Sequence, residues 1–535
     1  MMKKTLGLII VLLVSYWAVR SIFIPGYFPM HDDTQVARVV EMGKALREGQ
    51  FPVRWVSDLG YGLGYPLFNF YGPLPYYIGG FLYAIGISGL AATKFMMGLG
   101  VIFAGVTMYL VVTDLLGVSA GIVAAAFYTY APYHAVDIFV RGAVGEYWTL
   151  LFLPIIFWGF WRRRILVGSM GVAGLILSHT VLGYAGMLLI GLAALVSRMR
   201  KDVMLMIVLG LGLSAFFWLP AIAEMKFTDV SKVIGGAADF KNHFVCLGQL
   251  WNSQWGFGGS APGCLDGLSF KIGKEHLIAS LIAALGIFLF ARDKQARKLV
   301  IVGIGILALS VFLMLPVSEP VWSVIPLFSY VQYPWRFLTF AIFSVSLITS
   351  CVVSVVRAPL FRWAAVLVLV LVVLMVEVKR FVPQYTYPVA KGSLETVQDL
   401  RFRVSKISDE YLPPEVVKPA TVNDVMRDII PPSDLYSVKV IENLDTYKKF
   451  EFHSGTTNIV RINVANFPGW KYMVNDSMVV PELDHGLPLI TVPGGLTTVQ
   501  MWFRDTPVRT VGNVVSFAAL FLWLYLYDKR KKTIS

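Results

Sequence analysis

Three ionisable side chains, His31, Asp32 and Asp33, stand next to one another directly after the first apolar run of the chain. In a chain this apolar, charged residues where a span leaves the bilayer are candidates for function. A carboxylate in a partly dehydrated pocket has its pKa moved toward the working pH and can accept a proton from an attacking hydroxyl. These three residues are therefore the candidate catalytic groups. The alternative is that the aspartates only cap the helix that follows.

Arginines recur in the same loop and at the ends of later apolar runs. Arg54, Arg141 and Arg336 hold these positions, and His179 ends another run. Guanidinium groups bind phosphate in bidentate fashion and stay charged when buried, so these four residues are candidates for binding a lipid phosphate. The alternatives are that the arginines anchor headgroups, that Arg141 pairs with Glu146, and that His179 is a packing residue.

Aromatic and polar side chains beside these charges are the candidate substrate contacts. They are Trp55, Tyr65, Asn69, Tyr71, Glu146, Gln332 and Trp335. An acid and several guanidinium groups at one membrane level suit the transfer of a group from a phospholipid donor, because positive charge fixed in advance stabilises the departing phosphate.

The spacings typical of metal or nucleotide chemistry are missing. The chain has no Asp-x-Asp, no His-Glu-x-x-His and only 7 histidines. It also has no glycine-rich loop ending in Lys-Ser/Thr. We therefore expect no metal ligands and no resident cofactor. The run Gly60–Gly64 predicts a turn that brings backbone close to a ligand or a neighbour.

Composition indicates a membrane protein. Hydrophobic residues make up 56% of the chain, charged residues only 15%, and mean hydropathy is +0.67, whereas soluble domains carry about 25% charged residues. The net charge of +13 does not indicate a nucleic-acid partner, because the basic residues sit in short clusters between apolar runs, where the positive-inside rule places them.

The fold class that this predicts is a polytopic α-helical protein of the cytoplasmic membrane, with about twelve transmembrane helices and the N-terminus in the cytoplasm. With an even number of spans and a cytoplasmic N-terminus, the basic clusters all fall on the cytoplasmic side of the membrane. The clusters are at 162–164, 198–201, 292–298, 357–362 and 529–532. The expected spans are 5–24, 91–112, 119–130, 147–161, 165–183, 184–196, 203–219, 276–290, 299–315, 337–356, 363–378 and 511–527.

The chain then divides into a transmembrane domain at 1–379 with a catalytic first outer loop at 25–90, an extracytoplasmic domain at 380–508, and a last helix with a basic cytoplasmic tail at 509–535. Short strand-like runs broken by turn signals predict a β-sandwich for the second part. Cys246 and Cys264 share one outer loop, where a disulfide can persist.

These residues resemble the GT-C superfamily of membrane glycosyltransferases. The chain is most similar to the bacterial and archaeal branch labelled 6-pyruvoyl-tetrahydropterin-synthase-related membrane proteins, a label that is no evidence of pterin chemistry. The likeness covers most of the chain. The matching stretches are 31–33, 51–55, 62–68 with 71–74, Arg141-Gly142 with Glu146, Ser178-His179, 333–337, 466–470 and Thr506-Pro507.

The resemblance implies inverting transfer of a sugar from a polyprenyl-phosphate donor to a glycan, lipid or protein acceptor outside the cytoplasm. An acidic residue of the first outer loop would be the general base. By position this role falls on Asp32 or Asp33, and we favour Asp32. Relatives with monophosphate donors generally need no metal, but the second aspartate leaves open a divalent cation such as Mg²⁺ or Mn²⁺.

Other classes stay open at this point. A lipid or polysaccharide transporter would need ionisable residues deep within its spans, where aspartate and glutamate are nearly absent here. An envelope-assembly protein without catalysis would use the outer domain to bind a glycan or a partner. Within the enzyme class, the alternative is a polymerase or ligase that moves a preassembled glycan from a diphosphate lipid.

Overall fold

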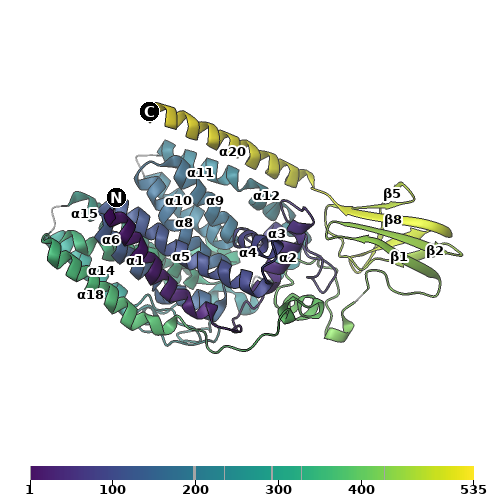
Figure 1. The fold of residues 1–535 in the computed structure, drawn as a ribbon, viewed down its shortest axis with the longest axis horizontal. Coiled ribbons are helices and arrows are strands. Elements are labelled where there is room, and N and C mark those ends of the chain that lie inside the picture. The colour runs from purple at the N-terminus through teal and green to yellow at the C-terminus, as the bar shows by residue number, and fades with distance from the viewer. Residues whose placement is uncertain are drawn as a thin grey trace. The chain divides into compact units, whose positions relative to one another are not determined.

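The computed structural model describes residues 2–196, 200–233, 235–290, 293–326, 328–426 and 428–534 (Figure 1). Arg198, Met199 and Arg292, which belong to predicted basic clusters, lie outside the described residues. The chain forms two compact units. The first unit consists of 1–32, 94–211 and 234–388, and the second unit consists of 33–93, 212–233 and 389–535.

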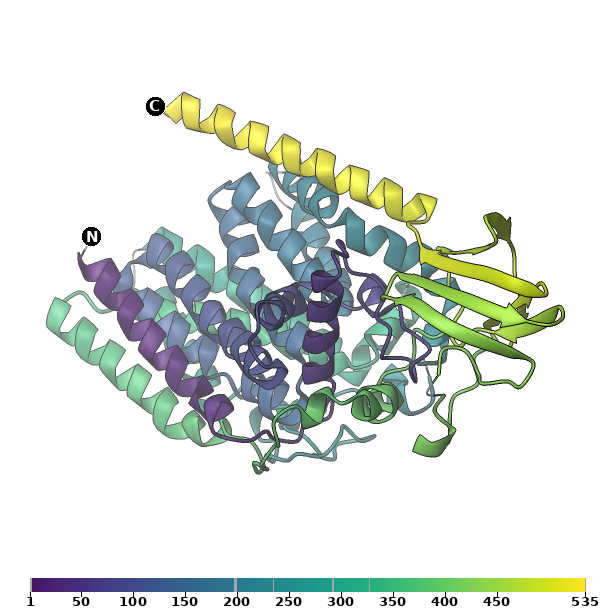
Figure 2. The same ribbon diagram turned by 45° about the vertical axis from the view of Figure 1, so that its right-hand side comes forward.

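The first unit is helical (Figures 1 and 2). Its longer helices are α1 (Met2–Val19), α5 (Gly89–Leu116), α6 (Val118–Thr129), α8 (Val144–Trp161), α9 (Ile165–Ser178), α10 (Thr180–Val196), α11 (Arg200–Leu213), α14 (Lys274–Leu289), α15 (Lys294–Met314), α17 (Leu338–Ser350) and α18 (Pro359–Glu377). Short helices are α7 (Pro132–Ala135), α13 (Leu247–Trp251) and α16 (Glu319–Val324), together with the π-helical turn η2 (Val136–Arg141) and the 3-10 turn η9 (Pro334–Phe337). α5 and α11 each cross from one unit into the other.

Small residues let neighbouring helices of the first unit approach closely. A Cβ on Gly168 of α9 would lie 3.0 Å from the Cα of Gly159 in α8. Because lipid tails are as apolar as leucine, membrane helices associate through such close packing and through hydrogen bonds.

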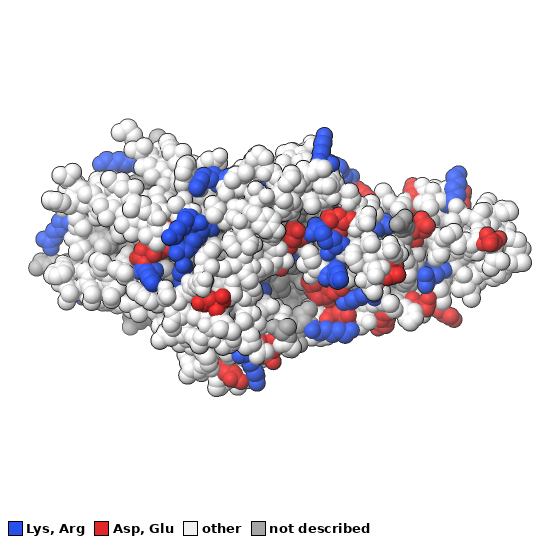
Figure 3. Space-filling model, turned by 90° about the horizontal axis from the view of Figure 1, so that it is seen from below, with Lys and Arg blue, Asp and Glu red and all other residues white. Residues whose placement is uncertain are grey.

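All twelve predicted spans contain helix, but the predicted number of spans is not supported. Within the described residues, seven helices are long and apolar enough to cross a membrane, or eight if α11 and the helix after it form one broken span. Four predicted spans fold as helices that are too short for this test: α6 with 12 residues, α9 with 14, α10 with 17 and α14 with 16. Figure 3 shows wide uncharged areas on the face it draws, as lipid-exposed helices require.

The second unit contains residues 33–90 of the predicted first outer loop and residues 389–508 of the predicted outer domain. Its helices are α2 (Gln35–Arg47), α3 (Leu67–Phe70), α4 (Leu74–Ala84), α12 (Ala215–Glu224), α19 (Ser405–Ile407) and α20 (Pro507–Ile534). The window that qualifies α20 as a span is only 6% buried within the protein.

Two antiparallel sheets form the β-rich part. The larger sheet has the order β1-β2-β8-β4-β5 and the smaller has β3-β7-β6. Alternate residues of β2 are buried, which gives the domain its core. The strands are β1 (Tyr436–Asn443), β2 (Tyr447–Ser454), β3 (Asn458–Arg461), β4 (Trp470–Val474), β5 (Ser477–Val479), β6 (Glu482–Asp484), β7 (Leu487–Val492) and β8 (Gly495–Phe503). The strand-like runs of the sequence, at 437–441, 448–453, 458–464, 469–474, 489–492 and 497–503, fall on six of these strands, and no such run indicated the three-residue strands β5 and β6.

A disulfide joins Cys246 to Cys264 in the first unit, with 5.5 Å between their Cα atoms. Cys351 is free and buried, and a cysteine of this kind packs as a small apolar residue.

Candidate active site

In the first unit, the segment that carries His31 and Asp32 runs along the π-helical turn η2, which precedes α8. The His31 amide donates a hydrogen bond to the Val140 carbonyl at 3.0 Å, and the Asp32 amide donates to the Arg141 carbonyl at 2.9 Å. The Nε2 atom of His31 donates to the carbonyl of Phe257 at 3.0 Å. These bonds fix the backbone of Asp32 at the backbone of Arg141.

Gly142 permits this approach. Its φ is +65°, a left-handed conformation that glycine adopts without strain. A Cβ at this position would lie 2.6 Å from the Cγ of Met30. The Arg141-Gly142 pair noted in the sequence is thus explained by the close passage of the first-loop segment.

The side chain of Arg141 lies in a buried ion-pair cluster. Its Nη1 atom is 2.5 Å from Oδ1 of Asp137, and its Nη2 atom is 2.8 Å from Oε2 of Glu146. The hydroxyl of Tyr133 donates to the other oxygen of Glu146. The guanidinium lies 4.5 Å from the ring centroid of Trp335. The predicted pairing of Arg141 with Glu146 is therefore present.

Arg336 shares the same carboxylate. Its Nε atom is 3.4 Å from Oε2 of Glu146, and its Nη1 atom donates to the Val331 carbonyl at 2.7 Å and to the Gln332 side chain at 3.4 Å. We call Arg141, Arg336, Asp137 and Glu146 the arginine cluster. Arg141 is 6% exposed and Arg336 is 9% exposed. Burial, followed by the charge of Glu146, raises the pKa of Asp137 well above its usual range, although Arg141 opposes the shift.

His179 has a local structural role, while its role in binding a lipid phosphate stays a prediction. Its Nδ1 atom accepts a hydrogen bond from the Leu182 amide at 3.1 Å, in the manner of a helix N-cap for α10. The ring lies beside α8, because a Cβ on Gly145 would be 3.3 Å from its Cδ2 atom.

In the second unit, Asp33 is held by an ion pair. Its Oδ2 atom is 2.8 Å from Nη1 of Arg403, whose Nε atom is 2.5 Å from Asp399. Burial raises the pKa of Asp33, and the charge of Arg403 opposes this shift.

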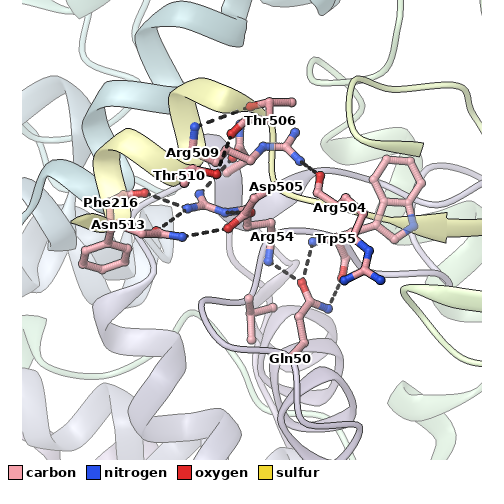
Figure 4. Close-up of polar contacts among 12 residues, drawn as sticks. Gln50, Arg54, Trp55, Phe216, Arg504, Asp505, Thr506, Arg509, Thr510 and Asn513 are labelled. Atoms are coloured by element: carbon pink, nitrogen blue, oxygen red, sulfur yellow. Dashed lines mark hydrogen bonds and ion pairs between the residues drawn. The ribbon is translucent and has the colours of Figure 1, made fainter. Parts of the chain in front are cut away.

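Arg54 is fully enclosed by partners from its own unit (Figure 4). The side chain is 2% exposed. Its Nη1 atom donates to Asn69 at 3.1 Å, and its Nη2 atom donates at 3.0 Å to both the Phe216 carbonyl and Asn513. Its Nε atom is 3.4 Å from Asp505.

The other candidate substrate contacts of the second unit also have partners within the chain. Trp55 is buried, with its ring 5.5 Å from that of Trp470 and 5.3 Å from that of Phe503. The Tyr65 hydroxyl is buried and accepts from the Tyr411 amide at 3.2 Å.

Asn69 is buried and donates to Glu224 at 2.8 Å. The Arg38 guanidinium lies 3.9 Å from the ring centroid of Tyr71. Whether any of these residues contacts a substrate stays a prediction.

Several charged residues of these clusters were not anticipated from the sequence. Glu224 receives two hydrogen bonds from Arg509, at 2.9 and 3.0 Å, and one from Thr506 at 2.6 Å. The only sign of this contact in the sequence was Arg509, a charged residue just before the apolar run of the predicted last span. Asp137 gave a similar signal, as an acidic residue between two apolar runs.

In the described part of the chain, no group of three or more histidine, cysteine, aspartate or glutamate side chains could hold a metal ion. We derive no step through a metal.

Comparisons with known proteins give distant matches. The chain matches no known family. An uncharacterised protein of Lactococcus lactis subsp. cremoris (strain MG1363) is 27% identical over 213 residues, which is 36% of this chain and 35% of that protein. This chain thus spans about a third of the curated relative that it matches.

Three solved structures are similar at low identity. Arabinofuranosyltransferase AftD from Mycobacteria gives a TM-score of 0.47 at 15% identity, over 73% of this chain and 28% of AftD. The Archaeoglobus fulgidus oligosaccharyltransferase with zinc and sulfate gives 0.41 at 16% identity, over 79% and 58%. The oligosaccharyltransferase AglB of the same organism, bound to an inhibitory peptide and a dolichol-phosphate, gives 0.42 at 14% identity, over 77% and 60%. With TM-scores below 0.5, these likenesses carry no argument about this chain.

Proposed function

We propose that the chain transfers a sugar from a polyprenyl-phosphate donor to an acceptor hydroxyl outside the cytoplasm, with inversion, and that Asp32 is the general base. One observation supports this most directly. The Asp32 amide is bonded to the Arg141 carbonyl, so the first-loop acid and a buried guanidinium stand on paired backbone segments.

In this reaction Asp32 takes the proton of the acceptor hydroxyl while the acceptor oxygen forms a bond to the anomeric carbon. The bond from that carbon to the phosphate oxygen breaks, and polyprenyl phosphate leaves with the electron pair. The positive charge of Arg141 and Arg336 stabilises the negative charge that develops on the leaving group. In the arginine cluster these two guanidinium groups stand against the carboxyls of Asp137 and Glu146, and burial raises the pKa of Asp137.

Asp33 is assigned a structural role. Its ion pair with Arg403 ties the start of α2 to the segment before the β-rich part. Because Oδ2 of Asp33 already accepts from Arg403, this aspartate has one fewer oxygen for the acceptor hydroxyl.

The proposal is tested with purified protein and a labelled polyprenyl-phosphate sugar. We expect Asp32→Asn to lose at least a thousandfold in transfer at an unchanged melting temperature. Asp33→Asn is the matched control and should keep most of the activity, because half-exposed ion pairs contribute about 1 kcal/mol or less. Release of free polyprenyl phosphate distinguishes transfer from transport. Full activity in Asp32→Asn would remove the base assignment.

A further inference from the structure

The last helix contacts the rest of the second unit along one polar stripe. α20 exposes most of its surface, but Arg509, Asn513 and Ser516 lie three or four residues apart and therefore on one face. Each of the three binds a group outside α20. The stripe faces α12. This helix follows α11 after a bend of 73°, and Ser214 lies at the break between the two helices.

Ser516 forms hydrogen bonds with backbone groups on both sides of this break. Its hydroxyl donates to the Gly212 carbonyl at 2.9 Å and accepts from the Phe216 amide at 2.8 Å. In hydrocarbon an unpaired backbone group costs several kcal/mol, so a broken membrane helix needs partners from a neighbour. Ser516 supplies both a donor and an acceptor at the two sides of Ser214.

Small residues bring the two helices close enough for these bonds. A Cβ on Gly512 would lie 2.8 Å from the Ala215 carbonyl oxygen, and a Cβ on Gly212 would lie 2.8 Å from the Cβ of Ala519. Glycine at both positions allows the backbone approach that membrane helix pairs use.

Arg54 extends this contact to the first loop. It bonds the Phe216 carbonyl at the helix break, Asn513 on α20 and Asn69 in α3, as Figure 4 shows for the first two. Arg509 holds Glu224 at the end of α12, and Glu224 accepts from the same Asn69. The loop, the broken helix and the last helix thus share one buried network of hydrogen bonds and ion pairs.

We propose that the stripe of α20 and Arg54 form a clamp that holds the first loop in its active arrangement, so that Arg54 is a positioning residue and not a ligand of the donor phosphate. This inference rests on the proposed function. Both Nη atoms of Arg54 donate to acceptors of the protein, its Nε atom lies 3.4 Å from Asp505, and the side chain is 2% exposed, which leaves it poorly placed to bind an exchanging phosphate. The last span then does more than anchor the β-rich part in the membrane.

The first test compares Ser516→Ala with Thr510→Val. Both changes remove one hydroxyl from α20, but Thr510 donates to the carbonyl of Thr506, which directly precedes the same helix. Hydrogen exchange of the segment 212–224, followed by mass spectrometry in detergent, should speed up about five- to tenfold in Ser516→Ala, as expected for the loss of a hydrogen bond of about 1 kcal/mol. Thr510→Val should leave it unchanged. Equal exchange in both variants would overturn the clamp.

The second test separates positioning from binding. Arg54→Lys keeps a positive charge but cannot reach four acceptors at once. We expect kcat for sugar transfer to fall at least tenfold with the donor KM unchanged, together with faster exchange at 212–224. A donor KM that rises at normal exchange would show a phosphate ligand and overturn the proposal. In a protein without sugar transfer, the exchange data still decide whether the clamp exists, so the two proposals fail separately.

Discussion

The Arg141 guanidinium and the Glu146 carboxylate form a buried ion pair with 2.8 Å between Nη2 and Oε2. Arg336 approaches the same oxygen at 3.4 Å, so Glu146 holds two guanidinium groups. Removing one partner of a buried pair leaves uncompensated charge, which typically costs 3–5 kcal/mol. We therefore expect Glu146→Gln to lower stability by about 3 kcal/mol or more, measured by thermal unfolding in detergent.

The matched control for this variant is Asp114→Asn. Asp114 pairs with Arg162 at the same 2.8 Å distance, but both side chains are about one-third exposed. Exposed pairs contribute about 1 kcal/mol or less. Similar losses in the two variants would mean that burial does not set the strength of the arginine cluster.

The disulfide gives a second prediction. Cys246 and Cys264 close a loop with a sequence separation of 18, for which loss of chain entropy in the unfolded state corresponds to about 3 kcal/mol. The Asp266 carboxylate also holds this loop, since it accepts from Ser253 at 2.6 Å and Gln249 at 2.8 Å. We therefore expect Cys246→Ser/Cys264→Ser to cost about 2–3 kcal/mol. Dithiothreitol should lower the melting temperature of the wild type and leave that of the double variant unchanged.

Helix positions could be predicted from the sequence, but helix ends could not. Apolar composition places every predicted span on a helix. However, the break between α9 and α10 falls at His179, five residues before the predicted boundary. There the Leu182 amide bonds a histidine side chain, a cap that hydropathy does not register.

The contacts within the candidate site follow from pairings that are distant in sequence. Arg54 and Asn513 are 459 residues apart, and no local pattern links them. The pairing of the 31–32 backbone with 140–141 depends on a π-helical turn and on Gly142, which composition does not predict either. The charged residues of the candidate site could therefore be identified from the sequence. Only the fold shows that Asp32 and Arg141 belong to one unit and that Asp33 and Arg54 belong to the other.

Lys448 predicts a pH dependence of stability. The side chain is 2% exposed, and burial lowers its pKa to about 8. A base with a lowered folded pKa stabilises the fold fully above its unfolded pKa of about 10.4 and loses this contribution as the pH falls through 8. We expect the wild-type melting temperature to rise between pH 7 and 10 and Lys448→Met to flatten this rise.

The neighbouring residue provides the control for the pH experiment. Lys449 lies half-buried on the other face of the same strand, so Lys449→Met should keep the wild-type pH dependence. The carboxyls that face Lys448 are Asp445, Glu48 and Asp58, and they oppose the effect of burial. A rise that persists in Lys448→Met would assign the pH dependence to another group.

The glycine-rich turn gives the last prediction. Gly64 has φ +83°, and a Cβ there would lie 2.7 Å from Cε2 of Trp55, a buried ring. Gly49 has nearly the same φ of +81° but nothing within 4 Å of a Cβ. Alanine in the left-handed region costs about 1–2 kcal/mol, and overpacking adds about 1–3 kcal/mol. Gly64→Ala should therefore lower the melting temperature clearly more than Gly49→Ala. Equal shifts would mean that the turn is constrained by its backbone alone and that Trp55 moves aside.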